Sequence, residues 1–163
     1  MSIPAPLSLH RDVVRPEWID YNGHMNVAYY LLAFDQACDA FLDFIGMDGP
    51  FRERTGGTTF AVDCHLTYQQ EVSEGDPIRF ESQLLAFDDK RIHHFHRMYH
   101  AEQGYLAATC EWLSLYVDLP TRRVTTLPKD IAARLAAVLT AHKALDWPPE
   151  AGRGVGLRVR EKA

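Results

Sequence analysis

The sequence predicts an α+β fold in which one long helix packs on one face of an antiparallel sheet of about five strands. The main observation is a change in hydrophobic period, from about 3.6 residues over 26–45 to about 2 residues after position 58. Turn signals divide the region after this change into short strand candidates, and another strand candidate precedes the long helix. A second amphipathic segment, at 128–145, adds a C-terminal helix.

The first elements in chain order are a strand over residues 7–15 and the long helix over 26–45. Apolar side chains recur at three- and four-residue spacing along that helix, as in a helix that buries one face. They are Val27, Tyr30, Leu31, Phe34, Cys38, Phe41, Leu42 and Ile45. Gly46 is a plausible helix stop, and we expect a loop over 46–57.

Four strand candidates follow that loop, at 58–72, 78–87, 91–100 and 105–119. In the first of them apolar and polar side chains alternate, which predicts a half-buried strand. The turn signals EGDP, DDK and EQG separate the four candidates, as in an antiparallel meander. The C-terminal helix then carries an apolar stripe formed by Ile131, Leu135, Val138, Leu139 and His142.

The composition is that of one globular domain, with 163 residues, 47% hydrophobic and 24% charged. We expect a single domain over 1–163, with its core at about 7–120 and a C-terminal helix and tail at 128–163. The net charge of −5 argues against nucleic acid as the main partner. The sequence shows no signal peptide and no apolar run near the roughly 18 residues of a membrane span, so we expect a soluble, cytoplasmic protein.

The polar turn before the long helix, "DYNGHMN" from Asp20 to Asn26, is the strongest functional signal. A helix start presents unpaired backbone N–H groups and a partial positive charge, which favour an anion or a developing oxyanion. Gly23 allows a sharp turn. A carboxylate such as Asp20 beside that site can attack a carbonyl carbon or deprotonate a water, which suits acyl transfer or hydrolysis. Asp, Asn and Gly are also common turn and cap residues, so a purely structural role stays open.

The stretch "IDYNGHMNVAYY" resembles the signature of hot-dog acyl-CoA thioesterases, the 4-hydroxybenzoyl-CoA thioesterase-like family. The family pattern is an Asp, two residues, Gly-His, a small apolar residue, an Asn and a Tyr-containing helix, and "LLAFDQA" continues the match. The order of elements agrees over roughly residues 7 to 120. Within the family, "RTGGTTFAV", "KRIHHFHRMYH" and "ATCEWLSLYVDL" are most similar to thioesterases of bacterial carnitine and betaine breakdown, which are assigned betainyl-CoA as substrate.

The resemblance implies a hot-dog fold, an acyl-CoA substrate and no cofactor. It implies that Asp20 is the nucleophile or the general base. It also implies that backbone N–H groups near Asn26 and Val27 polarise the thioester carbonyl. His24 would orient Asp20 or the substrate, or it would only pack in the turn.

The resemblance also implies a second subunit, because the fold usually works as a dimer with its acyl site at the subunit interface. We therefore expect a homodimer or a dimer of dimers, in which the partner's strand supplies the second wall of the site. The residues expected to contact the substrate are Gly23, Tyr29, Thr58, Thr59, Phe60, Lys90 and Arg91. Lys90 and Arg91 would meet the CoA phosphates, although a solvated turn explains this basic pair as well.

Two positions depart from the family pattern. Trp18 stands where relatives often have a second acid, and Val27 stands where many have a second Asn. Asp20 is thus the only acid expected at this turn, and Asp35 and Asp63 are reserve carboxylates, because members of the fold differ in which acid reacts. Two other functions stay open, a non-catalytic acyl-CoA-binding module and a hot-dog dehydratase.

The cysteines and the histidines of one strand are the candidate metal ligands of this sequence. The cysteines are odd in number and set in apolar runs, which favours buried free thiols over disulfides: Cys38, Cys64 and Cys110. His94, His96 and His100 share one face of a strand, but no carboxylate or thiolate is clearly placed to complete a zinc site. We expect no metal, and we expect this face to meet the dimer interface or a CoA groove.

Several aromatic side chains lie in or near the motif: Trp18, Tyr21, Tyr29, Tyr30, Phe60 and Trp112. A cationic acyl group such as betainyl would bind well against such rings, with help from an acid such as Asp35. Ordinary core packing explains the same rings equally well. The basic, Gly-containing tail at 152–163 is expected to be a loosely ordered end or an added strand.

Overall fold

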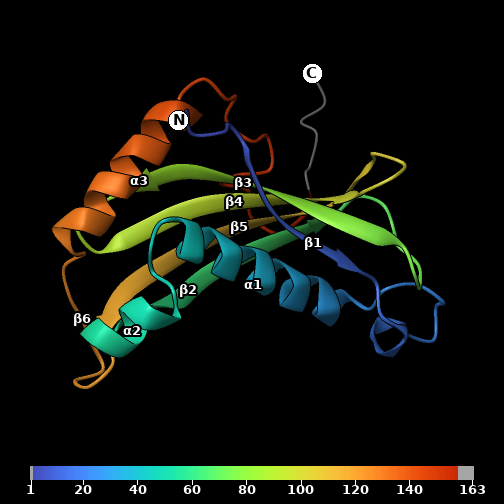
Figure 1. Cartoon of the computed structure of the whole chain (residues 1–163). Helices are drawn as coiled ribbons and strands as arrows, with labels where there is room; N and C mark the ends of the chain where they lie inside the picture. Colours follow the sequence, from blue (N-terminus) through green and yellow to red (C-terminus); the bar gives the residue numbers. More distant parts are fainter. Residues whose placement is uncertain (1, 158–163) are drawn as a thin grey trace.

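The computed structural model describes residues 2–157, in which a curled antiparallel sheet wraps around one long helix (Figure 1). The strands are β1 (Leu7–Val13), β2 (Gly57–Tyr68), β3 (Pro77–Phe87), β4 (Arg91–His100), β5 (Leu106–Asp118) and β6 (Arg123–Val124). The helices are α1 (Val27–Phe44), α2 (Gly49–Thr55) and α3 (Lys129–His142), with a 3₁₀ turn at Pro16–Trp18. The predicted α+β hot-dog fold is confirmed. Within the described residues, none of these helices has the length and apolar character needed to cross a membrane.

The strand order in the sheet is β1-β3-β4-β5-β2, with antiparallel pairing throughout, and β6 pairs with β5. β3, β4 and β5 form the predicted meander. The expectation that β2 continues it is wrong, because β2 pairs with β5 while β1 lies beside β3. The chain after β2 runs alongside the residues before α1 instead of turning back in a hairpin. The Met25 N–H donates to the Val72 C=O at 2.9 Å, and the Gly75 N–H donates to the Val14 C=O at 2.9 Å.

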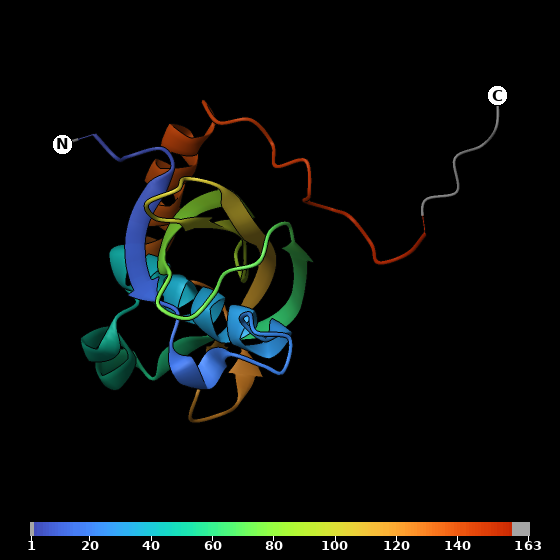
Figure 2. The same cartoon turned by 90° about the vertical axis from the view of Figure 1, so that its right-hand side faces the viewer.

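α1 lies in the concave side of the sheet and supplies one wall of the core (Figure 2). Asn26 caps it. Its buried side chains are Tyr30, Ala33, Phe34, Ala37, Cys38, Phe41 and Leu42, and Ile45 follows them. The predicted apolar stripe is wrong at two positions, since Val27 is 57% exposed and Leu31 is exposed as well. Both lie on the side of the helix that the curled sheet does not cover in the single chain.

α3 packs on the outer face of the sheet against β3 (Figure 1). Its buried side chains follow the predicted stripe, with Leu139 only partly buried: Ile131, Leu135, Val138 and His142. His142 Nδ1 accepts a hydrogen bond from the Leu84 N–H at 2.8 Å, beside a bulge of β3 between Leu84 and Ala86. The pairing of β1 with β3 ends at Ser82, so β1 does not reach the Leu84 N–H, and His142 supplies its partner.

The expected loop over 46–57 contains the seven-residue helix α2, so this expectation is wrong. Asp48 caps the helix by accepting a hydrogen bond from the Phe51 N–H at 2.9 Å, and Gly56 ends it with a φ of 67°. The Asp, Gly and Pro residues that start α2 are equally common in loops. Two helical turns also contain too few apolar repeats for their period to be recognised in sequence.

β2 is the exposed edge of the sheet and not the half-buried strand that its alternation predicts. A bulge between Ala61 and Asp63 interrupts the alternation of sides. Val62 is 50% exposed and Tyr68 is 51% exposed. An edge strand with unpaired backbone groups and exposed apolar side chains is a ready place for a second chain to pair.

Candidate active site

The polar turn before α1 is fixed by its own backbone hydrogen bonds. The Gly23 N–H donates to the Asp20 C=O at 2.9 Å, and the Asp20 N–H donates to the His24 C=O at 3.1 Å. Gly23 has a φ of 80°, a conformation that L side chains rarely adopt, so the turn requires glycine at this position. The turn therefore has one defined shape, and the side chains on it have defined directions.

Asp20 and Asn26 lie together, as the sequence predicts. One carboxylate oxygen of Asp20 accepts a hydrogen bond from the Asn22 N–H at 2.8 Å, and the other accepts one from the Asn26 side-chain amide at 3.2 Å. The side-chain oxygen of Asn26 accepts from the Ala28 N–H at 2.9 Å, which makes Asn26 the N-cap of α1. One residue thus caps the helix and holds a half-buried carboxylate at the positive end of the helix.

The backbone N–H groups at the start of α1 differ in their partners. The Asn26 N–H donates to the Trp18 C=O at 2.8 Å. Ala28 donates to the side chain of Asn26, and Tyr29 donates to the Asn26 C=O at 3.0 Å. The Val27 N–H has no hydrogen bond among residues 2–157. Of the two positions named from the sequence, only Val27 therefore offers an N–H group to a ligand.

A cavity of about 180 Å³ lies against this turn, and its lining residues are His24, Met25, Val27, Tyr30, Tyr68, Gln69, Gln70 and Glu71. Tyr68, the last residue of β2, donates its hydroxyl to the Val27 C=O at 3.3 Å and so ties the edge strand to the helix. His24 donates from Nδ1 to the Met25 C=O at 3.1 Å, which leaves its Nε2 facing Glu71 at 3.9 Å. Sequence reasoning missed Tyr68 and Glu71, for which a polar strand end, "YQQE", is the only signal.

Two tyrosines of the first helical turn have different surroundings. Tyr29 stacks on Trp18, with ring centroids 5.9 Å apart and planes inclined by 18°. Tyr30 is buried and meets the Tyr68 ring edge-on at 5.2 Å. Burial raises the pKa of Tyr30 to about 12, so its hydroxyl stays protonated at neutral pH and is a neutral donor beside the cavity.

The residues expected to form the second wall lie at the other end of the sheet. They begin β2: Thr58, Thr59 and Phe60. An extended strand separates them from Tyr68 by about 30 Å. Lys90 and Arg91 lie at the same far end, since Arg91 and the start of β2 both pair with one part of β5. A single chain therefore does not bring these five residues to Asp20.

Lys90 and Arg91, at the β3–β4 turn, lie beside the negatively charged side chain of Asp88. Arg91 donates from Nε to the Asp88 carboxylate at 2.7 Å. The backbone N–H groups of Lys90 and Arg91 donate to the other Asp88 oxygen at 2.9 Å and 2.7 Å. The hydrogen bonds from Arg91 and Lys90 lower the pKa of Asp88 to about 2. Arg91 is thus held in place while its guanidinium stays exposed.

A second cavity, of about 200 Å³, lies at this far end between α1 and β2. Its lining includes Asp35, Asp39, Arg52, Thr58, Thr59 and Trp112. Burial, and then the charge of Asp35, raises the pKa of Asp39. The reserve carboxylate Asp35 is thus placed with the expected second wall and not with Asp20.

Comparison with known proteins decides the family. A family model described as "Thioesterase-like superfamily" matches residues 14–135, which is most of the chain. The chain belongs to the thioesterase-like superfamily. The predicted enzyme class, a thioester hydrolase, is confirmed.

Similar proteins cover nearly the whole of this thioesterase. A betainyl-CoA thioesterase of Pseudomonas aeruginosa is 39% identical over 151 residues, which are 93% of this chain and 95% of the relative. An L-carnitine dehydrogenase/betainyl-CoA thioesterase of Rhizobium meliloti is 37% identical over 154 residues, which are 94% of this chain but 31% of that longer protein. A solved structure of a hypothetical protein from Staphylococcus aureus in complex with CoA matches with a TM-score of 0.87 and 27% identity, over 97% of this chain and 100% of the other.

The histidine cluster of this thioesterase lies in the core, so the expectation of an interface or a CoA groove is wrong. His94 and His96 are fully buried between the sheet and α1. His96 Nδ1 lies 2.8 Å from the Ser82 hydroxyl, and His96 Nε2 lies 2.7 Å from His94 Nδ1. A thiol does lie beside them, contrary to expectation, since Cys38 Sγ is 4.0 Å from His94 Nε2. Cys110 is also buried, as predicted.

Burial keeps all the groups of this cluster neutral. It lowers the pKa of His96 to about 3 and the pKa of His94 well below its ordinary value. It raises the pKa of the Cys38 thiol, and the charges of nearby aspartates add to that shift. The third cysteine, Cys64, is exposed on β2, so the expectation that all three thiols are buried is wrong.

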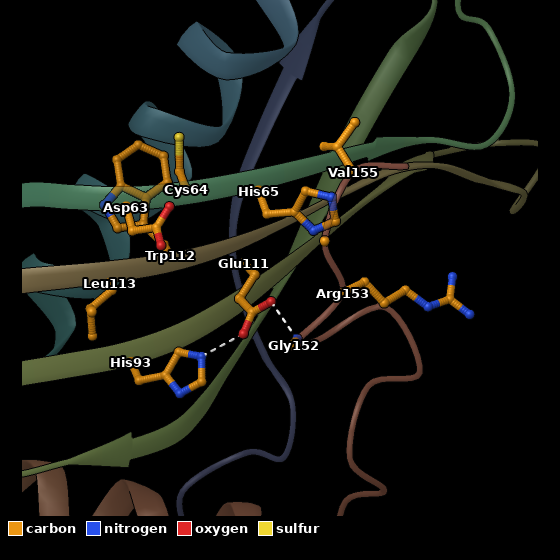
Figure 3. A pocket seen from close by; sticks show the side chains of 11 residues that line it. Asp63, Cys64, His65, His93, Glu111, Trp112, Leu113, Gly152, Arg153 and Val155 are labelled. Carbon is orange, nitrogen blue, oxygen red and sulfur yellow. Dashed lines mark hydrogen bonds and ion pairs between the residues drawn. The ribbon is translucent and has the colours of Figure 1, made fainter. Parts of the chain in front are cut away.

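The largest of the described cavities, about 600 Å³, lies on the outer face of the sheet and not at Asp20. Figure 3 shows it between the side chains of the sheet and the C-terminal segment. The reserve carboxylate Asp63 lines it. This cavity contains no helix N-terminus, whereas the Asp20 turn combines a carboxylate with an available N–H group, so we place the candidate centre at the turn. Residues 152–157 form no strand, and the remainder of the tail, 158–163, lies outside the described residues.

Proposed function

We propose that this thioesterase hydrolyses acyl-CoA thioesters at the Asp20 turn and that betainyl is its acyl group. The observation that carries the proposal is the carboxylate of Asp20, which Asn22 and Asn26 hold at the N-terminus of α1, the helix whose first residue, Val27, keeps an N–H group without a hydrogen bond among residues 2–157. The acyl group is proposed from the similarity to the betainyl-CoA thioesterase of Pseudomonas aeruginosa. The relative that also carries an L-carnitine dehydrogenase supports a role in carnitine breakdown.

The Val27 N–H is the donor that we assign to the thioester carbonyl. Negative charge that develops on the carbonyl oxygen is stabilised by this N–H and by the positive end of α1. As a general base, Asp20 takes a proton from a water while the water oxygen bonds to the carbonyl carbon. The C–S bond of the tetrahedral intermediate then breaks, and the CoA thiolate leaves and takes up a proton.

The geometry also permits Asp20 to act as the nucleophile. Its carboxylate then attacks the carbonyl carbon and displaces the CoA thiolate, and water hydrolyses the resulting mixed anhydride. Each oxygen of Asp20 accepts one hydrogen bond and keeps a lone pair for either task. Both routes use the same carboxylate and the same N–H donor.

A second copy of the chain, paired through β2, completes the proposed site. Two β2 strands paired antiparallel about a two-fold axis place the start of each strand beside the end of the other. The partner's residues 58–60 then lie beside Tyr68 and Val27 of this chain, and the partner's Lys90–Arg91 turn lies at the same end. Exposure of the β2 edge supports this pairing, which suits a homodimer or a dimer of dimers.

The cavity at Asp35 and Asp39 gives the proposed acyl group a place to bind. Two carboxylates outnumber the one guanidinium of Arg52 in the lining and so attract a trimethylammonium group, to which the indole of Trp112 in the cavity wall adds an aromatic contact. The proposed pairing moves the partner's copy of this cavity toward Asp20. Tyr21, by contrast, is 96% exposed, and Trp18 is covered by Tyr29, so neither forms part of this cavity. The single domain over 1–163, the lack of a cofactor and the cytoplasmic location stay predictions.

The test is thiol release from a panel of CoA thioesters by the wild type, by Asp20→Asn and by Asp43→Asn. The panel contains betainyl-, short aliphatic, long aliphatic and aromatic acyl-CoA. It also contains 3,3-dimethylbutyryl-CoA, in which a neutral carbon of the same shape replaces the quaternary nitrogen of betainyl. We expect betainyl-CoA to react fastest and Asp20→Asn to lower kcat by about 10²–10⁴-fold, the usual effect of losing an acid–base group. Asp43 is exposed on α1, and its variant should match the wild type.

Each outcome of this panel changes a different part of the proposal. Equal rates for betainyl-CoA and its neutral isostere refute the cationic acyl group and leave the mechanism standing. Full activity of Asp20→Asn refutes the role of Asp20. Binding of CoA without hydrolysis of any thioester refutes the enzyme and supports an acyl-CoA-binding module.

A further inference from the structure

Glu71 is the one acidic side chain among the described residues that line the cavity of about 180 Å³ at the Asp20 turn. Its side chain is 69% exposed, and its Oε2 lies 3.9 Å from His24 Nε2. Among residues 2–157 His24 is its only ion-pair partner. An exposed pair of this kind contributes little to stability, so stability alone does not account for an acid at this place.

The backbone at Glu71 is held from two sides. The hydroxyl of Tyr105, just before β5, donates a hydrogen bond to the Glu71 C=O at 2.9 Å. The Met25 N–H donates to the C=O of Val72, the next residue, at 2.9 Å, and Val72 is fully buried. The exposed carboxylate of Glu71 therefore extends from a fixed backbone that is bonded to the Asp20 turn itself.

The imidazole of His24 is oriented by its Nδ1 N–H, which donates to the Met25 C=O at 3.1 Å. In the neutral ring Nε2 then carries a lone pair, and it faces the carboxylate of Glu71, which is an acceptor as well. A proton on Nε2 replaces this contact between two acceptors by an ion pair. The contact is thus complete in the protonated form of His24, and imidazole is the side chain that gains and loses a proton near neutral pH.

The cavity that His24 and Glu71 line is also lined by Val27, whose N–H we assign to the thioester carbonyl. It is smaller than the about 300–1,000 Å³ of common ligand pockets, so a thioester bound to that N–H has its sulfur within reach of the lining side chains. The departing thiolate takes up a proton, because an alkyl thiol has a pKa of about 8.5 and is mostly protonated at neutral pH. When Asp20 acts as the nucleophile it has no proton to give, so the sulfur needs another donor.

We propose that His24 donates its Nε2 proton to the leaving sulfur and that Glu71 is the positioning residue that holds the protonated ring at the cavity. The proposal rests on the proposed thioester hydrolysis at the Asp20 turn, which requires a proton at the sulfur. As the C–S bond breaks, its electron pair goes to the sulfur, the Nε2 proton moves to the sulfur, and the carbonyl double bond forms again. His24 is left neutral and regains a proton from solvent, to which its side chain is 31% exposed.

The experiment compares two betainyl thioesters, those of CoA and of thiophenol, because the more acidic thiophenol leaves with less help from a proton donor. For betainyl-CoA we expect Glu71→Ala to lower kcat/KM about tenfold and His24→Gln about 10²-fold, the lower end of the effect of an acid–base group. For the thiophenol ester both variants should stay within about threefold of the wild type. Glu74→Ala is the matched control and should equal the wild type, because Glu74 is an exposed acid of the same loop that does not line the cavity.

The double variant His24→Gln/Glu71→Ala shows whether Glu71 acts through His24. If it does, the double variant hydrolyses betainyl-CoA as fast as His24→Gln alone, and the two losses do not add. A further tenfold loss in the double variant overturns the positioning role of Glu71. Equal losses for both thioesters in His24→Gln overturn the proton transfer to sulfur, and in either case the proposed hydrolysis stands. A wild type that hydrolyses neither thioester overturns the proposed function and the proton donor together.

Discussion

Helix α1 begins at one cluster of reactive side-chain types and passes over another. At its N-terminus a cavity that is open to solvent is lined by Val27 and His24, and the half-buried carboxylate of Asp20 lies on the same turn. Further along, Cys38 faces the fully buried pair His94 and His96. By residue type the second cluster is the stronger candidate for catalysis, since thiols and imidazoles are the usual nucleophiles and bases.

The two imidazoles of the buried cluster line none of the described cavities, and Cys38, which lines the cavity at Asp35 and Asp39, stays a neutral thiol. One set of neutral tautomers satisfies the cluster, in which Ser82 donates to His96, His96 donates to His94, and His94 donates toward Cys38. Phe41 stacks on the His94 ring at 5.2 Å, and Trp112 stacks on it at 6.3 Å. Burial also removes the thiolate and the charged imidazole. Access and unused hydrogen-bonding capacity, more than residue type, therefore distinguish the candidate site from the core.

The largest effect on stability should come from the buried cluster. Replacing His94 by Ala leaves a cavity between Phe41 and Trp112 and an unpaired nitrogen on His96. We expect the free energy of unfolding to fall by about 3–5 kcal/mol, with a loss of kcat in the folded enzyme far smaller than that of Asp20→Asn. Urea unfolding and thiol release on the same samples measure both quantities.

Asp20→Asn is the matched variant for that comparison, because it should lower kcat by about 10²–10⁴-fold while changing the free energy of unfolding by less than about 1 kcal/mol. Phe41→Leu gives a milder disturbance of the buried cluster if His94→Ala does not fold. A stably folded His94 variant with strongly reduced kcat would contradict the division between core and site.

Acidification should destabilise the protein through the two buried histidines, His94 and His96. In the unfolded chain each histidine titrates near pH 6.5, as free histidine does. In the folded chain burial lowers the pKa of His96 to about 3 and that of His94 well below its ordinary value. The unfolded chain therefore binds more protons between these values, and the free energy of unfolding falls as the pH falls from about 6.5 toward 3. The slope is at most about 1.4 kcal/mol per pH unit for each histidine.

The variant His96→Asn isolates this contribution. Urea unfolding between about pH 7 and about pH 5 should show a flatter dependence in the variant than in the wild type. His142, whose pKa burial also lowers, contributes in the same direction in both proteins and cancels in the comparison. Identical slopes would assign the acid sensitivity to other groups and contradict the prediction.

The features of the fold that depend on residues close together in the chain could be predicted from the sequence. The periods of 3.6 and 2 residues and the turn signals depend on neighbours in the chain, so they gave α1, the strands β3 to β5 and α3. Asp20 and Asn26 are six residues apart, and the hydrogen bond between them follows from the turn that separates them. The turn also fixed where α1 begins, because Asn26 is its cap.

The remainder depends on contacts between distant segments. Cys38 and His94 are 56 residues apart, and no local pattern reports that helix and strand meet there. Tyr68 reaches Val27 because β2 lies at the edge beside β5, and turn residues do not specify which strand pairs with which. The second wall at 58–60 stays a prediction, because the single chain places it far from Asp20 and only a partner would bring it near.

The variants with the smallest expected effect test whether Asn26, the cap of α1, is also part of the site. Asn26→Ala removes both the cap and the hydrogen bond to Asp20, and we expect a loss of about 1 kcal/mol in the free energy of unfolding and a lower kcat. Asn26→Ser keeps a capping oxygen but is too short to reach the Asp20 carboxylate. It should therefore unfold like the wild type and still show the lower kcat. If Asn26→Ser restores kcat as well as stability, Asn26 acts on turnover only by holding the helix end, and the position of Asp20 depends on the backbone of the turn alone.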